Sequence, residues 1–569
     1  MMPVRRSLLC RFRANVKVVK RARKRVQVLV LSRRSFAALT THLAGAGSTH
    51  DAVEFRKETD RILDALSHDL SLSKLLKGLA TLYPKISSRG GLLLALALTD
   101  QADPELARFG HRRLMHWYLR RHAFSRAMEA ARAVLPVGDD TASDDYDALS
   151  VMVTTLSRLG DLAGAVRYAD AMHRLRPRAA EPLVKKALLF SESDPAKEMD
   201  LLRQSGAHES RSTSLGNMIY AGRLFDMKEY AEVDRLCMRA IEQPGDRDVS
   251  SFQGLRSSIR IVRDSDPSFI SPFLHDLGAD AELTTPTFDG IRFRPSSRNF
   301  PSRGLVSVVI TAFNAERFVA STLRSIALQD YSDLEIIVVD DQSTDSTRRV
   351  VEAFARDDQR IQLLSTPRNS GLFVAKNAGI NAAKGKYIAF CDSDDIWVPR
   401  HASTHVEEME RDPGLVVSHS RWVRLYDDCS LSFGHFGGGV ETCPHSSFLR
   451  REVFERVGYF DSVRFGGDRE FVERVELEFG SHAVSTIKSV LTLGRRHAAS
   501  LTTSGAGAFD GMMNSPPRVE YWNTWNDYHR RMVETSGRLF NSGDPETRPY
   551  AVPESMEPWM DPPAGMKES

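Results

Sequence analysis

Two patterns of apolar residues divide the chain. Between about residues 90 and 260, apolar residues recur at the three- and four-residue spacing of amphipathic helices, in Ala- and Leu-rich segments. After about residue 304, apolar runs of strand length alternate with helical segments; the runs are LVSVVIT (305–311), LEIIVVD (334–340), IQLLS (361–365) and KYIAFC (386–391). This alternation predicts a parallel, doubly wound α/β sheet. We therefore expect an all-α domain followed by an α/β domain.

The helical half contains a recurring helix-turn-helix pattern. Gly160 is expected to turn the chain before a helix that begins near Leu162. Tyr230 occupies the same position 68 residues later, which is twice a 34-residue period, and Phe124 occupies it 38 residues earlier. The pattern resembles degenerate tetratricopeptide repeats, and an ordinary helical bundle is the alternative. In either case residues 50–282 are expected to form a scaffold or a protein-partner surface rather than a catalytic site.

The segments outside these two domains have different compositions. Residues 283–303 mix Pro, Ser, Gly and Arg without periodicity, which predicts a linker between the helical domain and an α/β domain at 304–505. Residues 506–569 are expected to form a C-terminal helix and then, from about residue 543, a flexible Pro-rich tail. Residues 1–45 form a basic N-terminal segment.

Charge is distributed unevenly along the chain. Residues 1–36 hold twelve Lys or Arg, and no acid precedes Asp51. Without these twelve the chain has 65 basic and 74 acidic residues, so a nucleic-acid partner is disfavoured. The basic segment could lie on an anionic membrane surface, contact a partner, or remain a solvated tail.

Cysteine usage and hydropathy indicate a compartment. The five cysteines form no CxxC pair, which fits a reducing environment and argues against a structural zinc site. No apolar stretch reaches the length of a transmembrane helix, and the N-terminal apolar runs are too interrupted for a secretory signal. We therefore expect a cytoplasmic protein, with peripheral contact at the inner face of the membrane as a further possibility.

Three carboxylates follow the last of the four apolar runs, in the sequence CDSDDIW: Asp392, Asp394 and Asp395. At a separation of about 5 Å and an effective dielectric near 20, each pair repels by about 3 kcal/mol. Such a cluster needs solvation, protonation or a counter-charge, and a Mg or Mn ion that carries a phosphate-bearing ligand meets this need. The segment TAFNAERF after the first strand lacks the glycines of a dinucleotide or P-loop site, and Trp397 stands where an EF-hand loop requires Gly.

The ordered motifs VSVVITAFNAERF, LEIIVVDDQSTDST, RNSGLFVAKNAGINAAKG and KYIAFCDSDDIW together resemble the donor-binding half of the inverting glycosyltransferases of family 2, which have the GT-A fold. The resemblance covers about residues 305–500. It implies a donor site for a nucleotide diphosphate sugar, with Asp341 accepting a hydrogen bond from the base and Asp394 as the principal metal ligand. The other implied donor-site residues are Thr311, Phe313, Asn314, Lys376 and Asp392, the last at the ribose or the metal. Lys376 departs from the family, which commonly has Arg there, so the bidentate fork toward the diphosphate is lost.

Two later segments supply the remaining parts of the implied site. FGGDREFVER resembles the family's acidic motif at a helix start, which implies that Asp468 is the base that takes the proton of the acceptor hydroxyl. The alternative is that Asp468 caps the helix. GRRHAAS resembles a late family segment in which a His lies near the diphosphate or metal, so His497 is a candidate third ligand or, alternatively, a structural hydrogen-bonding residue.

The sequence therefore predicts a metal-dependent, inverting glycosyltransferase. The resemblance favours a UDP-sugar donor and implies a glycan or lipid-linked acceptor hydroxyl, in surface or capsular glycan synthesis. One alternative is a repeat scaffold whose transferase-like half is inactive, and the intact set of Asp392, Asp394 and Asp468 argues against it. A second alternative, a nucleotidyltransferase, requires a Gly-rich basic loop that TAFNAERF does not provide.

Overall fold

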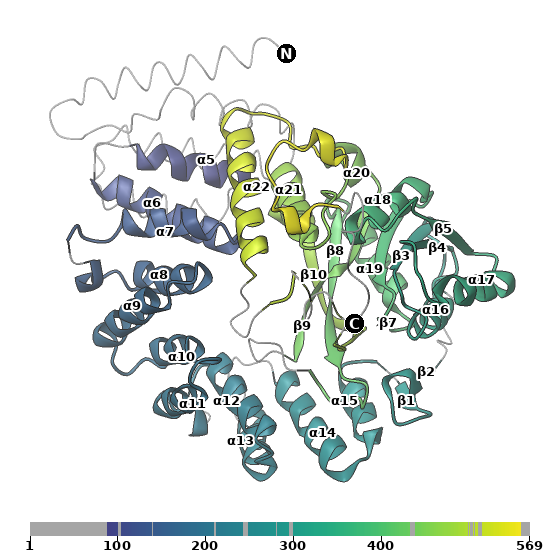
Figure 1. The fold of residues 1–569 in the computed structure, drawn as a ribbon, viewed down its shortest axis with the longest axis horizontal. Helices are drawn as coiled ribbons and strands as arrows, with labels where there is room; N and C mark the ends of the chain where they lie inside the picture. Colours follow the sequence, from purple (N-terminus) through teal and green to yellow (C-terminus); the bar gives the residue numbers. More distant parts are fainter. Residues whose placement is uncertain are drawn as a thin grey trace. The chain divides into compact units, whose positions relative to one another are not determined.

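The computed structural model describes residues 88–558, except 101–103, 139, 210–211, 243–248, 280, 295–299, 433–438, 499, 501–504, 506 and 510–514 (Figure 1). The predictions for the basic segment 1–45 lie outside the described residues. The chain divides into two compact units, and among described residues the first comprises 88–155 with 525–539 and the second 156–524 with 540–558. No helix in the described part of the chain is long and apolar enough to cross a membrane.

The first unit consists of helices. They are α5 (Ser88–Thr99), α6 (Pro104–Arg120), α7 (Phe124–Arg132), most of α8 (Tyr146–Arg158) and the second half of α22 (Pro516–Glu534). Trp525 of α22 is fully buried, and Asp527 forms an ion pair with Arg126 of α7 at 2.8 Å. Trp525 therefore packs in the core of this unit.

The second unit begins with further helices: α9 (Leu162–Leu175), α10 (Glu181–Leu188), α11 (Pro195–Gln204), α12 (Ser214–Asp226), α13 (Tyr230–Glu242), α14 (Ser250–Asp264) and α15 (Ile270–Asp276). Phe124, Leu162 and Tyr230, which the repeat pattern aligns, are each the first residue of a helix. The predicted helices are confirmed, and the assignment to tetratricopeptide repeats remains a prediction.

The segment that follows α15 is not the linker that the sequence predicts. Strands β1 (Ala281–Leu283) and β2 (Ile291–Phe293) pair in antiparallel register around a short 3-10 turn at Phe288–Gly290. Phe288 is fully buried, and it shares an apolar cluster with Val423 and Leu425. The prediction is wrong for residues 283–293 because their spaced apolar side chains are enough to fix the hairpin to the α/β domain.

An eight-stranded sheet forms the centre of the second unit, in the order β5-β4-β3-β6-β9-β8-β10-β7. Strands β3 (Val306–Ala312), β4 (Leu334–Asp340), β5 (Ile361–Ser365) and β6 (Tyr387–Asp392) are parallel, as predicted. The remaining strands are β7 (Ile396–Trp397), β8 (Val417–Leu425), β9 (Val440–Arg450) and β10 (Val484–Arg495). Because β9 runs antiparallel to β6 and β8, the complete sheet is mixed, and the four predicted strands form its parallel part.

The helices of the α/β domain are α16 (Val319–Ala327), α17 (Thr347–Asp357), α18 (Leu372–Ala382), α19 (His401–Arg411), α20 (Glu452–Val457) and α21 (Gly467–Phe479). Every residue of β3 is buried, so this strand lies in the core of the domain. In the register of the sheet, Thr311 of β3 pairs with Asp392 of β6, and Ala312 pairs with Asp340 of β4. The polar residues at the carboxyl ends of β3, β4 and β6 therefore lie side by side, at the position where α/β sheets bind ligands.

Candidate active site

The three aspartates of CDSDDIW have three different environments. Asp392 Oδ1 lies 3.9 Å from Lys376 Nζ, and Asp394 Oδ2 lies 2.9 Å from His497 Nε2. Asp395 is buried and accepts a hydrogen bond from Arg495 N at 3.2 Å. Burial, followed by the charges of Asp394 and Asp392, raises the pKa of Asp395 well above its ordinary value. The mutual repulsion of the three carboxylates is thus reduced in three ways. Asp392 lies near a lysine, Asp394 contacts a histidine, and the raised pKa of Asp395 favours its neutral form.

Lys376 is held in an aromatic pocket at this edge. Its side chain is 2% exposed, and Nζ lies 5.2 Å from the ring centre of Phe390, 5.6 Å from that of Phe373 and 5.9 Å from that of Phe460. The faces of aromatic rings attract a cation, and the carboxylate that pairs with Lys376 in the described part of the chain is that of Asp392. Since 3.9 Å exceeds hydrogen-bonding distance, Lys376 and Asp392 attract each other without a direct hydrogen bond.

Asp341 connects the end of β4 to the loop before α18. Its buried carboxylate accepts hydrogen bonds from Thr366 Oγ1 and Gly371 N, both at 2.7 Å, and from Ser370 N at 3.1 Å. These donors occupy both oxygens. Among the described residues, the side chain of the neighbouring Asp340 accepts one hydrogen bond, from Ser343 N at 3.2 Å.

Phe313 and Asn314 follow β3; both are exposed, and they differ in their contacts. The Phe313 side chain is 46% exposed, so its ring is available for stacking against a planar ligand. Asn314 has φ of +48°, and its Oδ1 accepts from Thr344 N at 2.8 Å. Asn314 therefore ties two loops together, and the structure gives its side chain a local partner already.

The ring of His497 packs against Phe318, which in turn packs against Arg495; neither residue is among the predicted site residues. The ring centre of His497 lies 4.8 Å from that of Phe318, and the guanidinium of Arg495 lies over Phe318 at 4.7 Å and over Phe288 at 4.2 Å. Arg495 is 1% exposed and pairs with Asp289 of the hairpin at 2.5 Å and with Asp427 at 2.9 Å. The hairpin thus supports the Asp394–His497 pair through stacked rings, and only the adjacent arginines in GRRHAAS give a sequence signal for this.

The donor set fits a hard divalent cation in part. Among the described residues, no three His, Cys, Asp or Glu side chains are grouped closely enough to form a metal centre by themselves. Asp394 and His497 are in contact, and Asp392 Oδ1 is a buried oxygen without a hydrogen-bond partner in the described structure. A Mg²⁺ site commonly uses one or two carboxylates and takes its remaining ligands from water and substrate phosphates, and these residues fit that pattern.

Asp468 is the second residue of α21. The preceding Gly466 has φ of +80° and is the N-cap of the helix, and no side chain caps it. Asp468 Oδ1 accepts from the neighbouring Arg469 N at 2.9 Å, so the helix-capping alternative is not observed. Burial lowers the pKa of Arg518 to about 10, and the charge of Asp468 opposes this shift, so an arginine faces Asp468.

Comparison with known proteins gives a family for part of the chain. Residues 307–436 match the model for glycosyl transferase family 2. The glycosyltransferase GlyG of Streptococcus pneumoniae is 34% identical over 155 residues, which are 27% of this chain and 50% of that protein. The putative glycosyltransferase EpsH of Bacillus subtilis is 36% identical over 216 residues, 34% of this chain and 62% of that protein. The chain therefore spans less than two thirds of the length of these relatives.

A third relative and one solved structure are similar over shorter or more divergent stretches. The UDP-Glc:alpha-D-GlcNAc-diphosphoundecaprenol beta-1,3-glucosyltransferase WfgD of Escherichia coli is 37% identical over 105 residues, 18% of this chain and 41% of that protein. The crystal structure of S. aureus TarS 1-349 in complex with UDP-GlcNAc is 18% identical with a TM-score of 0.29, covering 35% of this chain and 61% of that chain. The match to the family model covers the segment that contains Thr311, Asp341, Lys376 and Asp394. Residues 307–436 of this chain therefore match glycosyl transferase family 2.

Proposed function

We propose that the protein is a metal-dependent, inverting glycosyltransferase that moves a sugar from a nucleotide diphosphate sugar to a hydroxyl acceptor. The observation that carries the proposal is the meeting of Lys376, Asp392, Asp394 and His497 at the carboxyl edge of β6 within the family 2 domain. This set combines a buried cation with two carboxylates and an imidazole. It suits a ligand that has a diphosphate and a divalent ion.

In the proposed donor complex, Asp394 and His497 would hold Mn or Mg, with Asp392 completing the protein ligands or contacting the ribose. When bound, the metal would neutralise charge that develops on the leaving diphosphate. Lys376 would contact the diphosphate, and Thr311 and Phe313 would frame the base. Asp341 was predicted to contact the base, but its two oxygens are engaged by the loop at 366–371. Asp340, whose side chain accepts one hydrogen bond in the described structure, is therefore a second candidate acceptor for a base N–H beside Asp341.

Asp468 would act as the base on the acceptor side. Its carboxylate would take the proton from the acceptor hydroxyl as that oxygen attacks the anomeric carbon in line with the departing diphosphate, which inverts the configuration. Gly467 has an ideal Cβ position 3.2 Å from Phe373, one of the rings around Lys376. The start of α21 is thus packed directly against the proposed donor pocket.

The relatives support a proposal for the donor and acceptor classes. WfgD is named as a UDP-Glc-dependent enzyme acting on a diphosphoundecaprenol-linked sugar. We infer a UDP-sugar donor and a glycan or lipid-linked acceptor for this chain, in polysaccharide synthesis. A protein partner on the helices and a membrane contact through residues 1–36 remain hypotheses, and residues 1–36 lie outside the described residues.

The test is transfer by the Asp468→Asn variant. The full chain would be incubated with Mn²⁺, a synthetic GlcNAc-diphosphate-lipid acceptor and each of a panel of UDP-, GDP- and dTDP-sugars, and the glycosylated product measured. We expect Asp468→Asn to bind the nucleoside diphosphate as the wild type does and to lose about 10²- to 10⁴-fold in rate. Glu478→Gln, on the same helix, serves as the control. Full activity of Asp468→Asn would refute the assignment of the base.

A further inference from the structure

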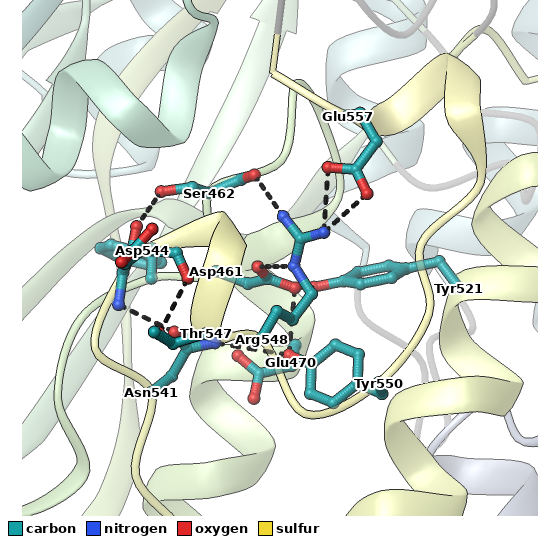
Figure 2. Close-up of polar contacts among 12 residues, drawn as sticks. Asp461, Ser462, Glu470, Tyr521, Asn541, Asp544, Thr547, Arg548, Tyr550 and Glu557 are labelled. Carbon is teal, nitrogen blue, oxygen red and sulfur yellow. Dashed lines mark hydrogen bonds and ion pairs between the residues drawn. The ribbon is translucent and has the colours of Figure 1, made fainter.

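A buried arginine holds the chain after α22 against the α/β domain. Arg548 is 4% exposed, and its Nε donates to Asp461 Oδ1 at 2.7 Å. Its Nη1 donates to Glu557 at 2.8 and 2.9 Å, and its Nη2 donates to the carbonyl of Ser462 at 2.8 Å (Figure 2). All three guanidinium nitrogens thus have acceptors. The expectation of a flexible tail from residue 543 is therefore wrong for residues 543–558.

Asp461 is the buried centre of this arrangement. Its Oδ2 accepts from Tyr521 Oη at 2.9 Å and from Tyr550 Oη at 3.0 Å, and Figure 2 shows both rings beside Arg548. Burial raises the pKa of Asp461, and the charge of Arg548 opposes that rise. Removing the guanidinium would leave a buried carboxylate without its cation, which strongly disfavours the folded arrangement of the loop.

Backbone hydrogen bonds extend this anchoring along a loop, residues 457–464. Tyr459 N donates to Asn541 O at 2.8 Å, Asn541 N donates to Val457 O at 3.0 Å, and Arg464 N donates to Met556 O at 2.9 Å. Gly458 has φ of +80°, and an ideal Cβ there would lie 2.0 Å from Asn541 O. Only glycine allows so close an approach. The C-terminal segment, residues 540–558, is therefore hydrogen-bonded to both ends of the loop, and we call this arrangement the clamp.

Loop 457–464 contacts both the pocket of Lys376 and the start of α21, which carries the proposed base Asp468. Asn377, next to Lys376, donates to Phe460 O at 2.9 Å and accepts from Phe460 N at 3.1 Å. Phe460 is one of the three rings around Lys376. At the other end, an ideal Cβ on Gly467 would lie 3.2 Å from Asp461 O, and Asp468 is the next residue. A shift of the loop would therefore move both the lysine pocket and the proposed base.

We propose that Arg548 is a positioning residue for the transfer reaction, acting through loop 457–464 on Asp468 and on the pocket of Lys376. The inference rests on the proposed function, and it adds to the family 2 segment 307–436 a required element from more than a hundred residues further along the chain. The C-terminal segment thus helps to position the residues of the proposed catalytic centre.

The test compares Arg548→Met with Arg450→Met in the full chain. Arg450 is the control because it is 14% exposed and bonds to Leu415 O at 2.8 Å, and it pairs with Tyr387 at the amino end of β6, away from the site. With the donor that the wild type uses, we expect Arg548→Met to lose about 10²-fold in kcat, since a 1 Å misplacement costs that much, and to raise the donor KM. Arg450→Met should keep kcat within about twofold at a temperature where it is folded.

A second measurement separates positioning from general stability. Hydrogen exchange at the amides of Tyr459 and Arg464 should accelerate in Arg548→Met and remain at the wild-type rate in Arg450→Met. The double variant Asp461→Asn with Arg548→Met removes the unpaired buried charge, so we expect it to recover stability but not kcat, and it replaces the single variant if that does not fold.

The outcomes separate the inference from the proposed function. Wild-type kcat and wild-type exchange in a folded Arg548→Met or in the double variant would overturn the inference while leaving the proposed function intact. Absence of transfer by the wild type with every donor would refute the proposed function instead. In that case faster hydrogen exchange in Arg548→Met would support only the structural role of Arg548 in holding loop 457–464. Unchanged hydrogen exchange would overturn that structural role as well.

Discussion

Acidification is expected to destabilise the α/β domain through two buried histidines of α19. The ring of His405 is stacked on that of Phe448 with centres 5.2 Å apart, and its Nδ1 lies 2.9 Å from Ser418 Oγ. Burial, and then the neighbouring His419, lowers the pKa of His405 from 6.5 to about 3. Burial also lowers the pKa of His401, whose ring lies 3.7 Å from that of Trp397, well below 6.5.

The direction in which stability changes with pH follows from the pKa of His405 in the folded and in the unfolded chain. Below pH 6.5 the unfolded chain protonates His405, whereas the folded chain does so only near pH 3, so stability is present above pH 6.5 and is lost as the pH falls from 6.5 toward 3. At about 1.4 kcal/mol per pH unit, His405 alone costs about 2 kcal/mol of unfolding free energy between neutral pH and pH 5. His401 adds to this loss.

The assay is urea unfolding of the wild type and of His405→Gln at pH 7 and pH 5, followed by tryptophan fluorescence. We expect His405→Gln to be less stable at pH 7, where it loses the stacked imidazole, and to show a pH dependence smaller by about 2 kcal/mol. His208→Gln is the control because His208 is 46% exposed. Equal pH dependence in His405→Gln and wild type would refute the reasoning, since it would mean that His405 titrates alike in both states.

Three other substitutions test the site and its supports. Lys376→Met should weaken binding of UDP with Mn²⁺ about tenfold in calorimetry, since a hydrogen bond to a charged group contributes about 1.5 kcal/mol or more, and unchanged affinity would argue against a diphosphate contact. Arg495→Met should lower the same affinity by releasing Phe318, whereas Arg411→Met, at a side chain that is 67% exposed on α19, should not; equal effects would contradict the supporting role. Gly458→Ala should lower the thermal midpoint by several degrees, because a positive φ alone costs a side chain about 1–2 kcal/mol, and a wild-type midpoint would show that the clamp tolerates a Cβ.

The sequence predicts the first half of the sheet well and the second half poorly, for a physical reason. Strands β3, β4 and β6 are nearly continuous apolar runs because almost every residue in them is buried, and the positions of β3 to β6 are confirmed to within a residue. Strands β8 and β9 interleave His and Ser with apolar residues, and these polar groups satisfy one another inside the core, as Ser418 does with His405 and Ser447 with His419. A pattern of hydrophobic positions does not reveal such pairs.

The same limit applies to the site. Motifs identify Asp394 and His497, which the fold brings into contact across 103 residues of chain. The pairs Arg495–Asp289 and Arg548–Asp461 join residues 206 and 87 positions apart and belong to no local motif, so only the folded structure reveals them. The linker and the tail were therefore assigned from composition, which does not report these long-range ion pairs.

The central claim is that the carboxylates after β6 form a metal-assisted donor site, and nucleotide titration tests it most directly. UDP, GDP, dTDP and CDP would each be titrated by calorimetry into the full chain with and without Mn²⁺, using the wild type and Asp394→Ala. We predict that one nucleotide, UDP, binds the wild type only with Mn²⁺ and that Asp394→Ala loses this binding. Binding of no nucleotide under any condition, or equal binding by Asp394→Ala, would contradict the account.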